Sequence, residues 1–160
     1  MSADLNVLVD GLDHAMFVVT AASRGRQAGC LVGFASQVSI DPPRLLVCLS
    51  VANHTYDVGR DSAVLAVHVL ARGQTELAAL FGSATGDEID KFTRCRWEPG
   101  PHGVPLLSDS RVWMVGQVIE KIPLGDHVGF VLDPIDVRRH DHGDALMFSD
   151  VQDLSPGHPA

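Results

Sequence analysis

The sequence predicts a mostly β protein, an antiparallel barrel with a few short helices. Many short segments rich in β-branched and aliphatic residues are separated by turn residues about every ten positions, a pattern typical of barrels. No Gly-x-Gly-x-x-Gly motif follows any of these segments, so a Rossmann dinucleotide site is not supported. With 160 residues, 46% of them hydrophobic and 20% charged, the chain matches one globular domain, which we place at residues 1–150.

The N-terminal part is expected to open with a short amphipathic helix. Apolar residues recur at helical spacing over residues 5–12, behind Asp4 as a candidate N-cap. The continuous apolar run at 15–21 is typical of a strand, and a Ser-Arg-Gly-Arg turn follows it. Further strands are expected at 29–39 and 44–50, because β-favouring residues fill their centres.

The C-terminal part combines strands with two more short helices. The apolar run at 63–70 is expected to be a buried strand. Over residues 74–81, Leu77, Leu80 and Phe81 share one helical face. The remaining expected elements are a short helix at 86–92, strands at 112–121, 127–138 and 145–148, and a disordered tail at 151–160.

The charge and the cysteine content of the chain indicate which partners it is expected to lack and in which cell compartment it is expected to lie. The net charge of −8 and the pI near 5.3 argue against a nucleic-acid-binding protein. No apolar run approaches the roughly 20 residues that a membrane helix needs, and Met-Ser-Ala-Asp does not open a signal peptide. Three widely spaced cysteines are expected to be reduced thiols, so we expect a cytoplasmic protein that binds neither nucleic acid nor membrane.

The segment from Gly29 to Pro43 carries the most specific signal in the chain. Ser36, Gln37 and Ser39 place polar groups where a plain sheet strand would carry apolar ones, and the segment ends in Asp-Pro-Pro. Gly33 would let the backbone approach another group closely. These features favour a strand that faces a flat ligand.

This segment resembles the signature of the flavin reductase-like, FMN-binding split-barrel family. The family signature, Gly-x-Thr-x-Ser-Ser-Phe-x-Ser-Val-Ser-x-Asp-Pro-Pro, aligns with it without a gap, and the resemblance extends from about Gly11 to Phe148. It implies a split barrel that forms a homodimer and binds FMN at the subunit interface. Two hydroxyls that face the flavin ring in the family are absent here, so backbone groups are expected to contact the ring. The expected ring contacts are Leu31, Val32, Gly33, Phe34, Ala35, Ser36 and Gln37.

A second polar segment, Ser50 to Tyr56, follows a buried strand. Hydroxyls, an amide and free N–H groups at a helix start suit a phosphate. The alternative is capping, with Asn53 or Thr55 as N-cap of a helix running to Asp61, and the two roles are compatible. In the family this loop grips the flavin phosphate. By resemblance the role falls on Ser50, Asn53, His54 and Thr55.

Two further matches complete the expected site. Gly125-Asp126-His127 resembles a family motif whose histidine lies beside the flavin face, so His127 is the expected catalytic, substrate-side residue. The alternative is a hairpin turn with His127 at a strand start. Lys91-Phe92 resembles the family's Asp-Lys-Phe, which implies that Lys91 approaches the cofactor.

Other polar clusters carry less weight. His140-Asp-His-Gly-Asp144 has a spacing that could hold a metal, but such a run is more often a solvated loop, and we expect no metal. His14 and His68 lie in apolar runs and are expected to be satisfied core histidines. No Ser-His-Asp or Cys-His arrangement with a family signature appears, so nucleophilic catalysis is not expected.

The resemblance implies NAD(P)H-dependent reduction of FMN, or of FAD, often in the service of a partner monooxygenase. Two alternatives stay open. One is a non-enzymatic flavin- or haem-binding split barrel. The other is a deazaflavin-dependent oxidoreductase, which the missing ring-facing hydroxyls would favour. The sequence does not discriminate NADH from NADPH.

Overall fold

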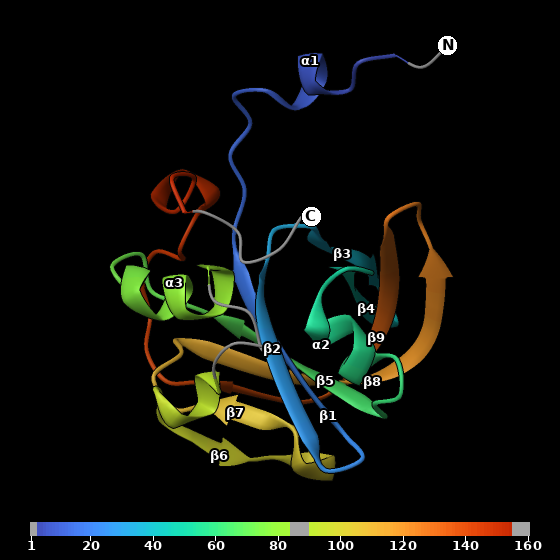
Figure 1. Ribbon diagram of the computed structural model, residues 1–160, viewed down its shortest axis with the longest axis vertical. Coiled ribbons are helices and arrows are strands. Elements are labelled where there is room, and N and C mark those ends of the chain that lie inside the picture. The colour runs from blue at the N-terminus through green and yellow to red at the C-terminus, as the bar shows by residue number, and fades with distance from the viewer. Residues whose placement is uncertain (1–2, 84–89, 155–160) are drawn as a thin grey trace.

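The computed structural model describes residues 3–83 and 90–154, and it confirms the mostly β prediction (Figure 1). Seven strands form one antiparallel sheet in the order β2-β1-β5-β8-β9-β4-β3, and β6 pairs with β7 in a separate hairpin. The strands are β1 (Phe17–Ser23), β2 (Arg26–Val32), β3 (Ala35–Ile40), β4 (Pro43–Ser50), β5 (Val64–Val69), β6 (Trp97–Pro99), β7 (Pro105–Leu107), β8 (Val112–Pro123) and β9 (His127–Arg139). The helices are α1 (Asn6–Val9), α2 (His54–Gly59), α3 (Thr75–Ser83) and the 3-10 turns η1 (Lys91–Thr93), η2 (Pro101–Gly103) and η3 (Phe148–Asp150).

The sheet curls into a barrel that does not close by hydrogen bonding. Its two edge strands are β2 and β3, and they are joined in sequence through only Gly33 and Phe34. Helix α2 packs against β2, β1 and β4 beside this seam, and it is seen between β2 and β4 in Figure 1. The architecture is the split barrel that the sequence predicted.

Tight turns set the register of the long hairpins. Arg24 and Gly25 both have positive φ, 53° and 74°, the geometry of the primed turn that matches strand twist. Gly125, with φ 85°, turns the chain between β8 and β9, where Leu124 N donates to His127 O over 2.8 Å. The second turn fixes where His127 starts its strand.

Three apolar clusters stabilise the described part of the chain, and the two largest fill the barrel and dock α3. The interior of the barrel is filled by side chains such as Leu49, Leu65 and Phe130, each at most 1% exposed, and burial of one such side chain contributes about 1.5–3 kcal/mol. A second cluster packs α3 against the outside of the sheet through Phe81. Gly29 makes this packing possible, because a Cβ there would lie 2.7 Å from Phe81 Cε1.

The structure differs from the expected elements at several places. The predicted strand at 145–148 is wrong: the chain makes only isolated bridges there, Ala15 with Met147 and Ala71 with Ala145, before η3. The predicted strand at 29–39 is divided, because the chain leaves one edge of the sheet at Val32 and enters the other at Ala35. The β6–β7 hairpin was not predicted, since its two strands have three residues each.

Two helices also end differently from the expectation. The N-terminal helix is limited to Asn6–Val9, and Asp4 accepts a hydrogen bond from Asn6 N without serving as the N-cap. Its apolar residues are exposed, so no packing extends it. In the region of the predicted 86–92 helix, 86–89 lie outside the described residues and Lys91–Thr93 form a 3-10 turn. Of the expected tail, Val151 is buried in the second cluster, and 155–160 lie outside the described residues.

The described part of the chain can be searched for a membrane-spanning helix and for a metal site. Among the helices of residues 3–83 and 90–154, none is long and apolar enough to cross a membrane. In the same residues no group of His, Cys, Asp and Glu is arranged to hold a metal ion. In the segment His140–Asp144, His140 Nδ1 instead lies 2.9 Å from Ser110 O, and Asp141 pairs with Arg111.

His68 is the satisfied core histidine that the sequence predicted. It is fully buried on β5, where its Nδ1–H donates to Val18 O over 2.9 Å and its Nε2 accepts from Leu107 N over 3.0 Å. The imidazole therefore connects β1, β5 and β7 in its neutral form. Burial lowers the pKa of His68 to about 4, although the bond to Val18 O opposes this change.

We expect His68 to make the stability of the protein depend on pH. Its pKa is about 4 in the folded chain and 6.5 in the unfolded chain, so the unfolded state binds the proton first as the pH falls. The contribution is complete above pH 6.5 and is lost toward pH 4, by about 3 kcal/mol in the free energy of unfolding.

Urea unfolding between pH 7 and pH 4 measures this dependence. His68→Gln should lower the stability at pH 7 and flatten the slope. The same substitution at the exposed His102 controls for the loss of one histidine. An unchanged slope in His68→Gln would contradict the assignment.

Candidate functional site

Three segments far apart in the sequence meet at one end of the barrel. They are the Gly33–Phe34 corner, the loop after β4 and the turn between β8 and β9. Strand β4 pairs with β3 on one side and with β9 on the other, and this register sets Ser50 opposite His127. Cys48 N donates to Phe34 O over 2.9 Å, and Val51 N donates to Asp126 O over 3.0 Å. The structure thus brings together the three motifs on which the sequence interpretation depends.

His127 is held on two sides. Its Nδ1–H donates to Asp126 Oδ1 over 2.7 Å, and the ring of Phe34 lies against its own ring with 5.0 Å between centroids and 50° between planes. The His127 side chain is only 17% exposed, whereas that of the neighbouring Asp126 is 72% exposed. The imidazole is a fixed, largely covered group at the start of β9.

The loop between β4 and α2 combines capping with inward-facing polar groups. Asn53 is the N-cap of α2, with Oδ1 accepting from Thr55 N over 2.9 Å, which confirms the capping alternative for Asn53. The helix ends at Gly59 and not at the expected Asp61. Ser50 Oγ accepts from Ala52 N over 3.3 Å. Thr55 is 1% exposed, so its side chain belongs to the interior. His54 begins the helix and is half-buried.

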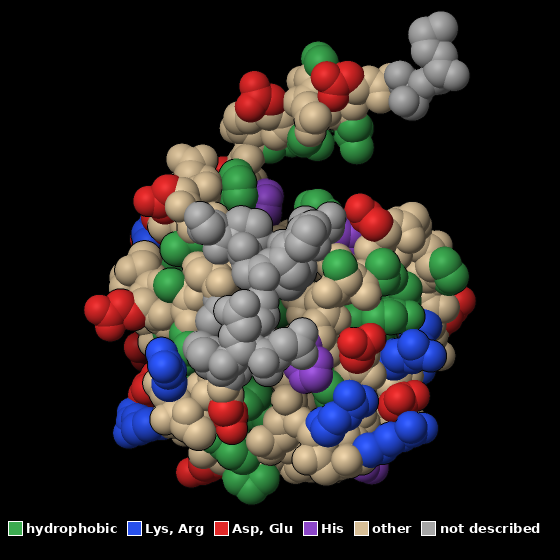
Figure 2. Space-filling model, viewed as in Figure 1, with side chains coloured by type: hydrophobic (Ala, Val, Ile, Leu, Met, Phe, Trp, Pro, Cys, Tyr) green, Lys and Arg blue, Asp and Glu red, His purple; other side chains and the backbone are tan. Residues whose placement is uncertain are grey.

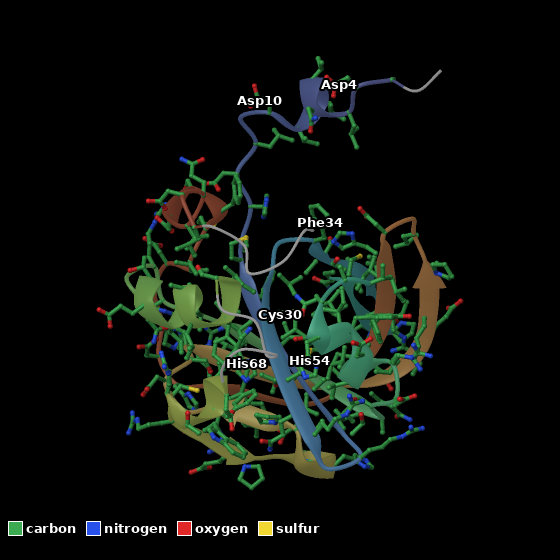
Figure 3. All side chains as sticks on the ribbon, viewed as in Figure 1. Asp4, Asp10, Cys30, Phe34, His54 and His68 are labelled. Carbon is green, nitrogen blue, oxygen red and sulfur yellow. The ribbon has the colours of Figure 1, made fainter. Side chains whose placement is uncertain are left out.

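Behind this loop lies the thiol of Cys30, on β2 (Figure 3). Burial raises the pKa of the Cys30 thiol, and this effect outweighs hydrogen bonds from Thr55 and Asn53, which lower it. The thiol is therefore a packed, neutral group that contacts the loop from the inside. The sequence interpretation missed this contact, because Cys30 and the loop are separated by two strands.

The segment expected to contact a ring divides into buried and exposed parts. The side chain of Val32 belongs to the barrel core, Ala35 packs against that core, and Leu31 packs against the α3 cluster. The side chains of Ser36 and Gln37 are exposed on the edge strand β3, each donating to a backbone carbonyl nearby. Only the backbone of the buried residues is left to serve a ligand.

Gly33 is surrounded by its own chain. A Cβ there would lie 2.8 Å from His14 Cε1 and 3.2 Å from Met16 Sδ. His14 is half-buried and stacks on Phe148 with 5.1 Å between ring centroids and 17° between planes. The absence of a side chain at Gly33 thus makes room for His14, and His14 is a wall of this corner and not the core residue that was expected.

Lys91 turns inward in the structure. It is 6% exposed, and its Nζ donates to Gly29 O over 2.9 Å and to Phe81 O over 3.2 Å. Burial lowers the pKa of Lys91. The side chain ties η1 to β2 and α3, and its expected approach to a cofactor stays a prediction.

The exposed part of the site can hold and orient a planar group. Apolar side chains gather on the visible face over β3, β4 and β9 (Figure 2), and the exposed ring of Phe34 lies at the end of the barrel (Figure 3). The Asp126 carboxylate holds His127 beside this surface. Such a site offers stacking and hydrogen bonds.

Asp126 is a second residue that the sequence interpretation did not single out. It supports His127 through its carboxylate and the β4–α2 loop through its carbonyl. The signal was present in the sequence, since a carboxylate directly before a histidine is placed to hold one ring nitrogen.

We expect Gly33→Ala to destabilise the protein because its Cβ would displace the His14 ring. Overpacking of this kind costs about 1–3 kcal/mol. The cost should largely disappear when His14→Ala is also present, since the space then exists. Thermal unfolding of the two single variants and the double variant measures this coupling. Additive losses would show that the contact does not set the requirement for glycine.

The chain is similar in sequence to a family of flavin reductase-like domains and to NADH- or NAD(P)H-dependent reductases. The family model described as "Flavin reductase like domain" matches residues 9–154. The FMN reductase (NADH) RutF of Pseudomonas syringae pv. syringae is 29% identical over 140 residues, which cover 88% of this chain and 78% of that protein. The ferric-chelate reductase (NAD(P)H) of Archaeoglobus fulgidus is 26% identical over 148 residues, covering 91% and 88%.

A solved structure extends the likeness to three dimensions. BorF, the flavin reductase component of a bacterial two-component tryptophan halogenase, superposes with a TM-score of 0.78 at 26% identity. The match covers 90% of this chain and 91% of that one. The two chains therefore share the same fold over nearly their whole length.

Proposed function

The chain belongs to the flavin reductase-like domain family, and on that premise we propose that it binds FMN and catalyses its reduction by NADH or NADPH. The observation that carries the proposal is the convergence of Phe34, the Ser50–Asn53 loop and His127 at the open seam of the barrel. These are the segments in which the sequence resembles the family.

The residues at the seam fit a flavin. Leu124 is 48% exposed and Val51 46%, so the loops beside the corner offer apolar surface to the face of a flavin ring. Strand β3 is a sheet edge, and its unpaired backbone groups can serve the pyrimidine edge of the ring. Ser50, Asn53 and His54 supply polar groups at the loop where the phosphate would lie.

The chemistry requires positioning more than acid–base catalysis. A bound flavin would supply the hydride acceptor, a capacity that no side chain at this corner has. The chain's own residues would hold the two planar rings in contact and keep water from between them. Asp126 keeps the His127 ring fixed, so this wall of the site is ordered before a ligand arrives.

Relatives suggest the finer assignments. The Pseudomonas relative is named for NADH and FMN, and BorF for a halogenase partner, which supports NADH as reductant and a monooxygenase or similar enzyme as consumer of reduced flavin. The exposed Val38 and Ile40 on the edge strand β3 support a homodimer. The expected cytoplasmic location follows from the same chemistry, because reduced nicotinamides are found there.

An absorbance spectrum of the purified protein with FMN, followed by anaerobic NADH, tests the proposal. We expect flavin absorbance that bleaches. Flavin that stays oxidised with both NADH and NADPH would indicate a binder, and a Soret band would indicate haem. Light scattering of the same sample tests assembly, and a monomer at micromolar concentration would contradict the homodimer.

We expect Asn53→Asp to weaken FMN binding about 10- to 100-fold, because it sets a negative charge beside the phosphate at a cost of roughly 1.4–3 kcal/mol. Aspartate preserves the cap on α2, so the fold should persist. Riboflavin, which lacks the phosphate, should bind with nearly unchanged affinity.

Fluorescence titrations with FMN and riboflavin measure the two affinities. Asn53→Ser is the neutral control, since serine also caps the helix. Equal losses for both ligands would place the phosphate elsewhere.

A further inference from the structure

Phe34 differs from the family signature in a way that changes the surface of the site. The signature has serine at this position, whereas this chain has a large aromatic side chain that is 62% exposed. Its backbone is fixed, because Phe34 O accepts from Cys48 N over 2.9 Å. The ring therefore projects from an ordered corner.

The ring of Phe34 covers His127. The two rings lie 5.0 Å apart, and the His127 side chain is only 17% exposed although Asp126 beside it is 72% exposed. Most of the Phe34 ring remains accessible. Phe34 therefore presents more accessible aromatic surface at this corner than His127 does.

A chain of contacts holds the Phe34 ring in place. Val51 N donates to Asp126 O, Asp126 Oδ1 accepts from His127 Nδ1 over 2.7 Å, and His127 lies against Phe34. These contacts join the β4–α2 loop, the β8–β9 turn and the Gly33–Phe34 corner. The orientation of the Phe34 ring therefore depends on the loop as well as on its own segment.

We propose that Phe34 provides the aromatic face on which the nicotinamide ring of the second substrate stacks, and that His127 is a positioning residue that holds Phe34. This inference rests on the proposed function. It shifts the direct contact from His127 to Phe34, because the accessible aromatic surface belongs to Phe34.

Three single variants, one double variant and one matched control test the proposal. Phe34→Leu keeps apolar volume but removes the ring, and Phe34→Tyr keeps the ring. His127→Ala removes the support, alone and in the Phe34→Leu background. Phe148→Leu is the control, because Phe148 is another partly exposed ring stacked on a histidine, with 5.1 Å to His14.

Phe34→Leu should raise the KM for NADH roughly three- to tenfold, the range for loss of one aromatic pair, with flavin affinity changed less than twofold. Calorimetric titration of the FMN-loaded protein with NAD⁺ should show the same weakening without turnover. Phe34→Tyr should retain the parental values. His127→Ala should raise the KM in the parent but add nothing in Phe34→Leu, because its effect passes through Phe34.

Failure of the proposed function and failure of this inference give different results. A parent that shows no reduction of flavin by NADH or NADPH removes the proposed function and this inference with it. An active parent in which Phe34→Leu leaves KM and NAD⁺ affinity unchanged overturns the inference alone. The same holds if Phe148→Leu produces an equal increase, or if the effects of His127→Ala and Phe34→Leu simply add.

Discussion

The pairing of β4 with two neighbours is the constraint on which the site depends. One strand supplies backbone hydrogen bonds to β3 on one side and to β9 on the other, so the Phe34 corner and the His127 turn have fixed positions relative to the same backbone. The loop that follows β4 then lies between them. The grouping of the three motifs is thus a result of strand register.

The open seam explains why the site lies where it does. A closed barrel would use the backbone groups of its edge strands in pairing, whereas here β2 and β3 are edges joined by a two-residue corner. The corner is not a regular strand, because the chain passes there from one edge of the sheet to the other. Gly33 lies in this corner, close to His14. Helix α2 packs beside the seam, against β2, β1 and β4.

The sequence predicted the parts of the fold that local pattern determines. The buried runs that became β1, β4 and β5 are continuous in apolar residues, and turn residues separate them. The β6–β7 hairpin has no such pattern: it is held by distant partners, with Thr20 Oγ1 donating to Pro105 O and His68 accepting from Leu107 N. Segments stabilised in this way by side chains elsewhere in the chain leave no local signal.

The sequence indicated which segments come together at the candidate site, but it gave less information on where their side chains point. Thr55 and Lys91 are polar residues in matching motifs, yet one contacts a buried thiol and the other two backbone carbonyls. The direction in which a polar side chain points depends on the packing around it, which a single sequence does not contain. Cys30 became visible as a partner of the β4–α2 loop only once the strands were placed.

Gly29, the glycine of the family signature, has a structural role that is separate from ligand binding. Its lack of a side chain accommodates the Phe81 ring of α3, on the side of the sheet where the second cluster packs. The glycine at this position is therefore required for packing of α3, whereas later positions of the same motif lie at the corner of the barrel. A related chain that replaces α3 with a smaller element could carry a larger residue at the first position and still bind the same ligand. Motif searches that require this glycine would overlook such a protein.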